Sequence, residues 1–141
     1  MPRTREQVIW DFIQLWLKKA NSRLKMAELC MEQISADPAT IVFYSHQAVE
    51  VYVKACLVYY QVPFSKCCDI SILADLFPPE EKQLADEVRK AEWLSPFGRD
   101  FPDPTTPGAS IETAQNGLRE ARRISQLVGA RLGDYLAKGR P

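Results

Sequence analysis

One segment, residues 41–60 with the sequence IVFYSHQAVEVYVKACLVYY, is apolar around almost its whole circumference and constrains the rest of the chain. Apolar side chains recur there at alternating spacings of three and four residues, which is the period of an α-helix. The run is rich in β-branched and aromatic residues, as a strand would be, but it is too long for one strand and has no internal Gly or Pro. The segment therefore predicts a helix that is buried between neighbouring helices.

The polar residues of this segment form one narrow stripe, made of His46, Gln47, Glu50 and Lys54. At about 100° per residue, these four positions share one side of the helix. Glu50 and Lys54 are four residues apart with the acid first, the order that favours an ion pair along a helix. Two interpretations are open: the stripe is a solvated helix face, or it contacts a ligand in a cleft.

The N-terminal part of the chain predicts a helix of about thirty residues. Thr4 and Gln7 have the spacing of a capping box, and apolar residues follow at helical spacing. The first half of this helix is more apolar than one core face requires, because several side chains lie outside the stripe set by Ile13, Trp16 and Ala20. These side chains are Val8, Trp10, Leu15 and Leu17. We therefore expect a homodimer that uses this half of the helix; the alternative is that shorter helices fold back over it within one chain.

Further capping signals divide the rest of the chain. Asp37 with Pro38 after it predicts the start of the central helix. Asp69 predicts the cap of a short helix, a second short helix follows, and Ser110 predicts the cap of a last long helix. Residues 95–108, SPFGRDFPDPTTPG, hold four prolines and two glycines, which predicts a long irregular loop. Long loops in compact domains often carry function.

Three long helices and one shorter pair, joined mostly by short turns, predict an all-α fold. The arrangement expected is an antiparallel up-and-down helical bundle with left-handed packing. The length suits a single domain over residues 1–141. Four arginines on the last helix predict a solvated face, with phosphate or RNA contact as the alternative: Arg119, Arg122, Arg123 and Arg131.

Charge and composition limit the partners and the compartment. Lys and Arg total 18, as do Asp and Glu, so no strong overall field attracts DNA or an anionic membrane. No uninterrupted apolar run approaches the ~20 residues that span a bilayer, and no signal-peptide pattern opens the sequence, so we expect a cytoplasmic protein. We predict neither metal nor cofactor. Cys30 and Cys56 suit buried apolar faces, while the alternative of a zinc site would require convergence of His46, Cys67, Cys68 and Asp69, two of them adjacent cysteines.

Residues 45–55, SHQAVEVYVKA, resemble the signature helix of the HEPN domain family, whose pattern is QA, then E, then KA, at this spacing. Members then carry a short helix that starts with a His-Asp-Leu-like sequence, for which this chain has CDI at residues 68–70 and so lacks the histidine. They continue to an Arg-Tyr-Pro-Asp-like loop, to which RDFPD at residues 99–103 is similar with one extra residue and Phe in place of Tyr. The resemblance covers most of the chain and implies a small helical bundle.

The family resembles the helical substrate-binding domain of kanamycin-type nucleotidyltransferases, and free-standing members are often partners of a separate small nucleotidyltransferase subunit. Other members are ribonuclease toxins with an Arg, four to six residues, and a His. Here the only histidine is His46, and residues 39–41 contain no arginine, so that motif is missing. The glycine-serine loop and paired aspartates of a nucleotidyltransferase are missing too, so this chain alone cannot perform two-metal nucleotidyl transfer.

The resemblance therefore implies a non-catalytic accessory module that binds a nucleotide or similar substrate for a minimal nucleotidyltransferase, as in a toxin-antitoxin-like pair. The residues expected to contact the ligand are His46, Gln47, Glu50, Lys54, Arg99 and Asp103, with Lys54 and Arg99 facing phosphate. For Arg99 and Asp103, anchoring of the loop by hydrogen bonds is the alternative. The alternative function is a degenerate ribonuclease that acts on RNA with His46 as general base.

Overall fold

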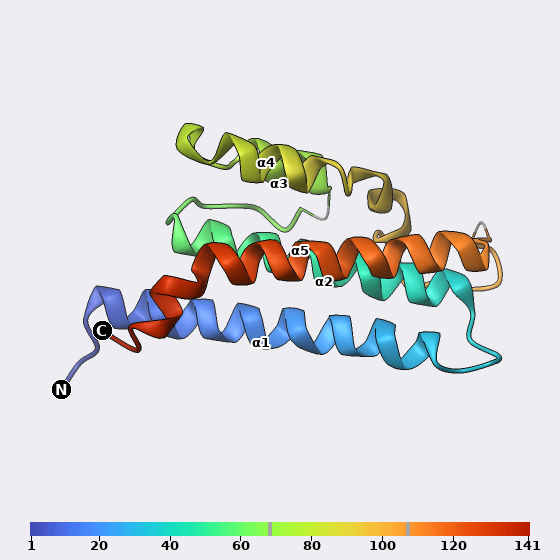
Figure 1. The fold of residues 1–141 in the computed structure, drawn as a ribbon, viewed down its shortest axis with the longest axis horizontal. Helices are drawn as coiled ribbons and strands as arrows, with labels where there is room; N and C mark the ends of the chain where they lie inside the picture. The colour runs from blue at the N-terminus through green and yellow to red at the C-terminus, as the bar shows by residue number, and fades with distance from the viewer. Residues whose placement is uncertain (68, 107) are drawn as a thin grey trace.

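In a computed structural model of the chain, which describes residues 1–67, 69–106 and 108–141, every regular element is a helix. The long helices are α1 (Arg5–Met31), α2 (Pro38–Tyr59) and α5 (Ile111–Ala137), and the short ones are α3 (Ile70–Asp75) and α4 (Lys82–Arg89). Two 3₁₀ helices, η1 (Pro79–Glu81) and η2 (Glu92–Phe97), flank α4. Figure 1 shows the long helices side by side, with α3 and α4 packed as a second layer on α2 and α5. The all-α bundle of three long helices and a shorter pair is confirmed.

Contacts between the helices show their relative directions. Arg5 at the start of α1 donates a hydrogen bond to Gln61 just after α2, and the Tyr52 hydroxyl donates to Asn21, so α1 and α2 are antiparallel. In contrast, α2 and α5 run the same way, because α4 carries the chain back between them (Figure 1). Successive helices of the bundle, α1, α2, α4 and α5, therefore alternate in direction.

The predicted capping residues are confirmed. The Thr4 hydroxyl accepts from the Gln7 amide at 3.1 Å, while the Gln7 side chain accepts from the Thr4 amide at 3.0 Å. Asp37 accepts from a backbone amide in the first turn of α2, Asp69 from two amides in the first turn of α3, and Ser110 from one in α5. Each cap satisfies backbone donors that the first turn of a helix leaves without partners.

The predicted burial of the central helix is also confirmed. Most residues of α2 are buried, and they share one apolar cluster with side chains from all the other α-helices. Ala48 and Ala55 are both fully buried, which lets neighbouring helices approach α2 closely. At the crossing of α2 and α5, a Cβ on Gly117 would lie 3.6 Å from the Cβ of Ser45. The α2 helix is therefore the scaffold on which the other elements are placed.

The structure differs from the sequence prediction in two places. The expected irregular loop starts later, because η2 continues through residues 95–97 and includes Pro96. The hydroxyl of Ser95 accepts a hydrogen bond at 3.1 Å from the amide of Ile70, which ties η2 to the start of α3. One residue of that loop, Pro107, lies outside the described residues.

The second difference concerns two of the four arginines of α5 that the sequence assigned to a solvated face, since Arg119 and Arg122 are exposed but Arg123 and Arg131 are half-buried. Arg123 pairs with Glu87 of α4 at 3.0 Å, and Arg131 pairs with Glu81 at 2.9 Å. The Arg131 guanidinium also lies over the Tyr59 ring, 5.4 Å from its centroid. Arg123 and Arg131 therefore connect α5 to α4 and to η1. A further pair, Arg122 with Glu28, connects α5 to α1. Such contacts join segments far apart in sequence, which helical periodicity does not predict.

Candidate functional site

The polar stripe of α2 is inside the molecule. His46 has no exposed surface, and Glu50 and Lys54 are each 8% exposed. Gln47 is half-buried and is the stripe residue that solvent reaches most easily. The expectation of a solvated helix face is wrong, and the stripe does not line an open cleft. Ligand contact by the three buried residues would require the segments above them to move.

Lys54 is held by two contacts. Its Nζ lies 3.1 Å from Oε1 of Glu50, which confirms the predicted ion pair, and 5.6 Å from the centroid of the Phe64 ring. Phe64 comes from the segment after α2 and packs edge-on against Trp16 of α1, with centroids 5.5 Å apart. A cation over an aromatic face is stabilised by the quadrupole of the ring, and burial strengthens this interaction. The ammonium is thus enclosed between a carboxylate and an aromatic cover.

His46 is covered by the start of the loop. A Cβ built on Gly98 would lie 1.9 Å from Nδ1 of His46 and 2.3 Å from its Cγ. Only a residue without a side chain can lie this close to the imidazole, so Gly98 is required by contact rather than by a turn. The contact joins the stripe to the start of the loop. It also sets the position from which Arg99 and the following residues of the loop extend.

Beyond Gly98 the loop forms an open hollow of about 500 Å³. Its lining residues include Arg99, Asp100, Phe101, Thr105 and Thr106. Phe101 is 58% exposed, and its ring packs edge-on against two half-buried rings of α2, Phe43 at 5.3 Å and Tyr44 at 6.1 Å between centroids. Arg99 is exposed and makes no hydrogen bond or ion pair with the described residues. The hollow therefore offers an aromatic face and an available guanidinium.

Asp103 anchors this loop, which was one of its two predicted roles. Its carboxylate accepts hydrogen bonds from the amides of Thr105 at 2.8 Å and Thr106 at 3.1 Å, and from the Thr105 hydroxyl at 2.6 Å. These hydrogen bonds, led by that of the Thr105 side chain, lower the pKa of Asp103 below its usual value. The residue is charged at neutral pH and holds the turn that shapes the hollow.

Comparison with known families identifies this chain. The sequence model of the HEPN domain matches residues 13–131, which is most of the chain. The chain belongs to the HEPN family. No curated protein and no solved structure matches it.

The predicted interface residues of this HEPN chain have different surroundings. The Trp10 ring packs on Tyr135 of α5 with centroids 5.1 Å apart, and Leu17 packs against the core. Val8 is half-buried, while Leu15 is 62% exposed. Part of the surplus apolar surface is thus covered within one chain, by α5 rather than by the short helices that the alternative proposed. The homodimer itself stays a prediction.

Other sequence predictions concern metal sites and membranes. Among the described residues of the HEPN chain, no group of His, Cys, Asp and Glu side chains has the arrangement of a metal site. Cys68, part of the zinc alternative, lies outside those residues. Burial raises the pKa of the Cys56 thiol to about 12, in keeping with its predicted apolar surroundings, whereas Cys30 is half-buried. No helix in the described parts of the chain is long and apolar enough to cross a membrane.

Sequence reasoning missed the residues that cover the site of this HEPN chain. Phe64 and Gly98 enclose the stripe, and Phe43 and Phe101 supply the aromatic face of the hollow. The only signal for Gly98 was its position in a proline-rich segment next to the RDFPD motif. No periodic pattern links these residues to the stripe, because they come from irregular segments.

Proposed function

We propose that this HEPN chain is a non-catalytic accessory module that binds a nucleotide or similar ligand for a separate nucleotidyltransferase subunit. The observation that carries the non-catalytic part is the burial of His46, which has no exposed surface and lies directly under Gly98. A general base must come within about 2.6–3.2 Å of the proton it removes. The 2′-hydroxyl of an RNA strand cannot approach this imidazole while Gly98 covers it.

The hollow beside Arg99 is the place we assign to the ligand. The exposed Phe101 ring offers a surface on which a nucleobase can stack, and stacking on an aromatic side chain contributes about 1–3 kcal/mol per base. Arg99 can donate hydrogen bonds to phosphate oxygens. Asp100 and Asp103 give the hollow a net negative charge, so the phosphate gains little from the overall field. We therefore expect weak binding to which the base contributes more than the phosphate.

The buried stripe has a supporting role in this proposal. Glu50 and Lys54 neutralise each other beneath Phe64, and His46 supports Gly98 at the base of the loop. Of the six residues that the resemblance assigned to the ligand, Arg99, Asp103 and Gln47 have side chains that a ligand could reach directly. Asp103 also acts through the turn it holds. A role in a toxin-antitoxin-like pair is part of the same proposal and rests on the family resemblance.

Calorimetry with ATP tests the ligand site. We expect weak binding that is reduced in Arg99→Ala and more strongly reduced in Phe101→Ala, since stacking supplies most of the affinity. Lys82→Ala is the matched control, because Lys82 is exposed on α4, away from the hollow. No heat with ATP or with other common nucleotides, in the presence of a nucleotidyltransferase partner as well, would refute the ligand site.

Incubation of the pure protein with single-stranded RNA tests the alternative function. We expect no cleavage by the parent. Metal-independent cleavage that disappears in His46→Ala, in a variant shown by circular dichroism to be folded, would establish the degenerate ribonuclease instead.

A further inference from the structure

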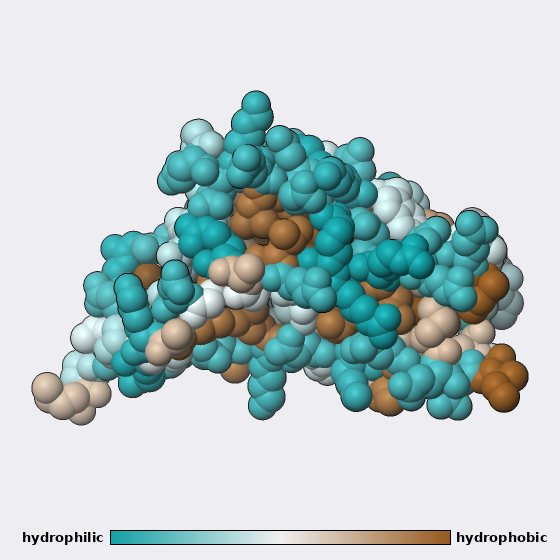
Figure 2. Space-filling model, viewed as in Figure 1, coloured by the Kyte–Doolittle hydropathy of each residue, from teal (hydrophilic) through white to brown (hydrophobic). Residues whose placement is uncertain are grey.

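Helix α1 has a second apolar face that the fold does not use. Its core face is marked by Ile13, Ala20 and Ala27, which are fully buried. Four large apolar side chains remain 37–62% exposed and fall within about 100° of the circumference, on another side of the helix: Phe12, Leu15, Met26 and Leu29. In Figure 2, brown atoms are visible among teal ones along the lower edge of the molecule, where α1 runs. We call these four residues the outer stripe.

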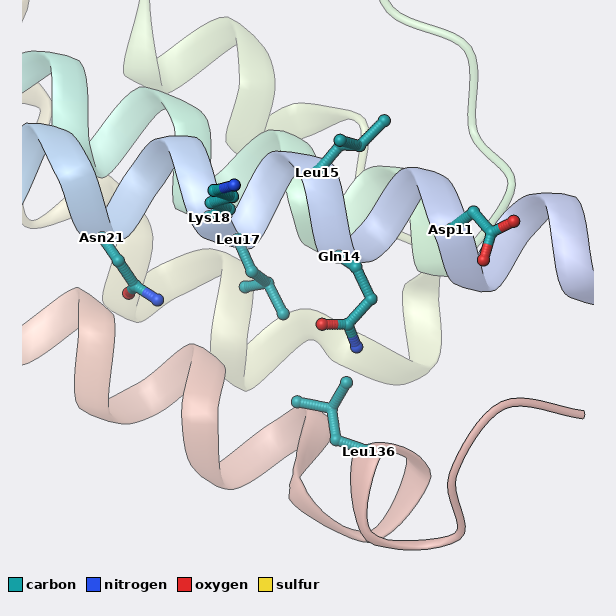
Figure 3. A pocket seen from close by; sticks show the side chains of 7 residues that line it. All are labelled: Asp11, Gln14, Leu15, Leu17, Lys18, Asn21 and Leu136. Atoms are coloured by element: carbon teal, nitrogen blue, oxygen red, sulfur yellow. The ribbon is translucent and has the colours of Figure 1, made fainter.

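The outer stripe meets the gap between α1 and α5 at Leu15 and continues away from it along α1. Figure 3 shows Leu17 of α1 and Leu136 of α5 pointing toward each other across this gap, whereas Leu15 points away from it. Leu17 and Leu136 line a groove of about 700 Å³, and Leu15 lies at its edge. No described segment of the chain covers the outer stripe. The outer stripe forms two apolar groups on one helix face, Phe12 with Leu15 and Met26 with Leu29, and such exposed apolar groups are typical of a surface that contacts another molecule.

The charges beside the outer stripe are positive. Lys18, Lys19 and Lys25 are exposed, and none of them forms an ion pair with the described residues. Two acids of α1 near these lysines are already paired: Asp11 with Arg140 at 2.9 Å and Arg3 at 2.8 Å, and Glu28 with Arg122 at 3.0 Å. The outer stripe is thus flanked by lysines that no ion pair with the described residues neutralises. A partner surface that pairs with them must carry carboxylates.

We propose that the outer stripe docks an amphipathic helix of a partner protein, with apolar residues at helical spacing and Asp or Glu at their flanks. The partner's apolar side chains pack on Phe12, Leu15, Met26 and Leu29, while its carboxylates pair with the lysines. This inference rests on the proposed accessory role and names the chemistry by which the second subunit is recognised.

Lipid and a second copy of the chain fit the outer stripe less well. Lys19 and Ser22 lie on the same side of α1 between Leu15 and Met26, so insertion of the stripe into lipid would bury an ammonium without a partner. In a two-fold pairing of α1 with itself, the centre of the stripe lies on the axis, near residues 20 and 21. Lys18, Lys19 and Arg23 of both copies would then crowd together without a carboxylate between them. An acidic partner helix satisfies the same cations.

Two synthetic helical peptides test the proposal. They share one leucine face and differ only in the flanking residues, which are Glu in one and Lys in the other. By fluorescence anisotropy at low ionic strength, we expect the acidic peptide to bind at least about tenfold more tightly, and this preference to weaken with salt. The triple variant Lys18→Glu, Lys19→Glu, Lys25→Glu should prefer the basic peptide instead. Phe12→Ser with Leu15→Ser should lose binding of the acidic peptide.

Matched controls are Lys82→Glu for charge and Ile72→Ser for exposed apolar surface, both on the layer of α3 and α4. The proposal is overturned if the two peptides bind equally or not at all. It is also overturned if Phe12→Ser with Leu15→Ser abolishes binding to phosphatidylserine vesicles, or converts a dimeric parent to a monomer in light scattering. Because the test uses neither nucleotide nor Arg99, its failure is distinguishable from failure of the ligand site.

Discussion

The contact between Gly98 and His46 makes a strong prediction about stability. In Gly98→Ala, the new methyl group would lie 1.9 Å from Nδ1 and 2.1 Å from Cε1 of a fully buried ring. Ordinary contact begins at 3.4 Å, so the loop and the imidazole must separate by roughly 1.5 Å. Overpacking of this kind costs about 1–3 kcal/mol, and we expect a loss of at least about 2 kcal/mol. For a chain of this length, this corresponds to a Tm lower by about 5–15 °C.

Urea denaturation followed by circular dichroism measures this loss. Gly129→Ala is the matched control, because Gly129 lies within α5 and a Cβ there meets nothing within 4 Å. That change should stabilise the protein by about 0.5–1 kcal/mol, since alanine has the higher helix propensity. The two Gly→Ala changes thus have opposite expected signs.

A double-mutant cycle assigns the loss to the imidazole. His46→Ala removes the obstacle, so Gly98→Ala should cost at least about 1 kcal/mol less in that background than in the parent. A Gly98→Ala variant as stable as the parent, or a loss unchanged in the His46→Ala background, would refute the proposed packing of the loop on the stripe. It would also remove the basis for regarding His46 as inaccessible to RNA.

Three other predictions test the fold. Ala55→Leu should lower the free energy of unfolding by about 1–3 kcal/mol, because residue 55 is fully buried in the core; an unchanged thermal midpoint would contradict this. The Cys56 thiol, with its pKa raised to about 12 by burial, should resist iodoacetamide at neutral pH until the protein unfolds, which peptide mass spectrometry can follow. Hydrogen bonds from Arg140 and Arg3 lower the pKa of Asp11 from 3.8 to about 2. The ion pair of Arg140 with Asp11, which holds the C-terminal tail on α1, is therefore fully present above about pH 3.8 and is lost as the pH falls through 2. Faster amide exchange in the tail over that range would report the loss.

The helices of this HEPN chain were predictable because their signals are local. Thr4, Asp37, Asp69 and Ser110 each cap a helix where the sequence placed a cap. Capping and helical periodicity act over a few residues, so one sequence is enough to recognise them. The buried central helix followed from its composition in the same way.

The environment of the polar stripe was not predictable, because it depends on irregular segments. His46, Glu50 and Lys54 look like a solvent-facing stripe on a helical projection, yet Phe64 and Gly98 bury them. Those two residues lie in loops whose path is set by tertiary packing. The same limit applies to Trp10, whose partner Tyr135 is at the other end of the chain.

His46 of the stripe packs against the start of the loop at Gly98, and this bears on how the proposed site works. A buried ion pair such as Glu50 with Lys54 loses hydration, so its net contribution to stability is small even though removal of one partner is costly. The buried stripe positions the residues that cover it. Lys54 lies against the Phe64 ring, and His46 lies against Gly98, after which Arg99 and Phe101 line the hollow. Ligand binding in the proposed site would then depend on His46, which the ligand does not touch. Glu50 and Lys54 of the QA, E and KA pattern lie against Phe64 in the segment after α2, and the chemistry available to a ligand in the hollow is carried by the loop.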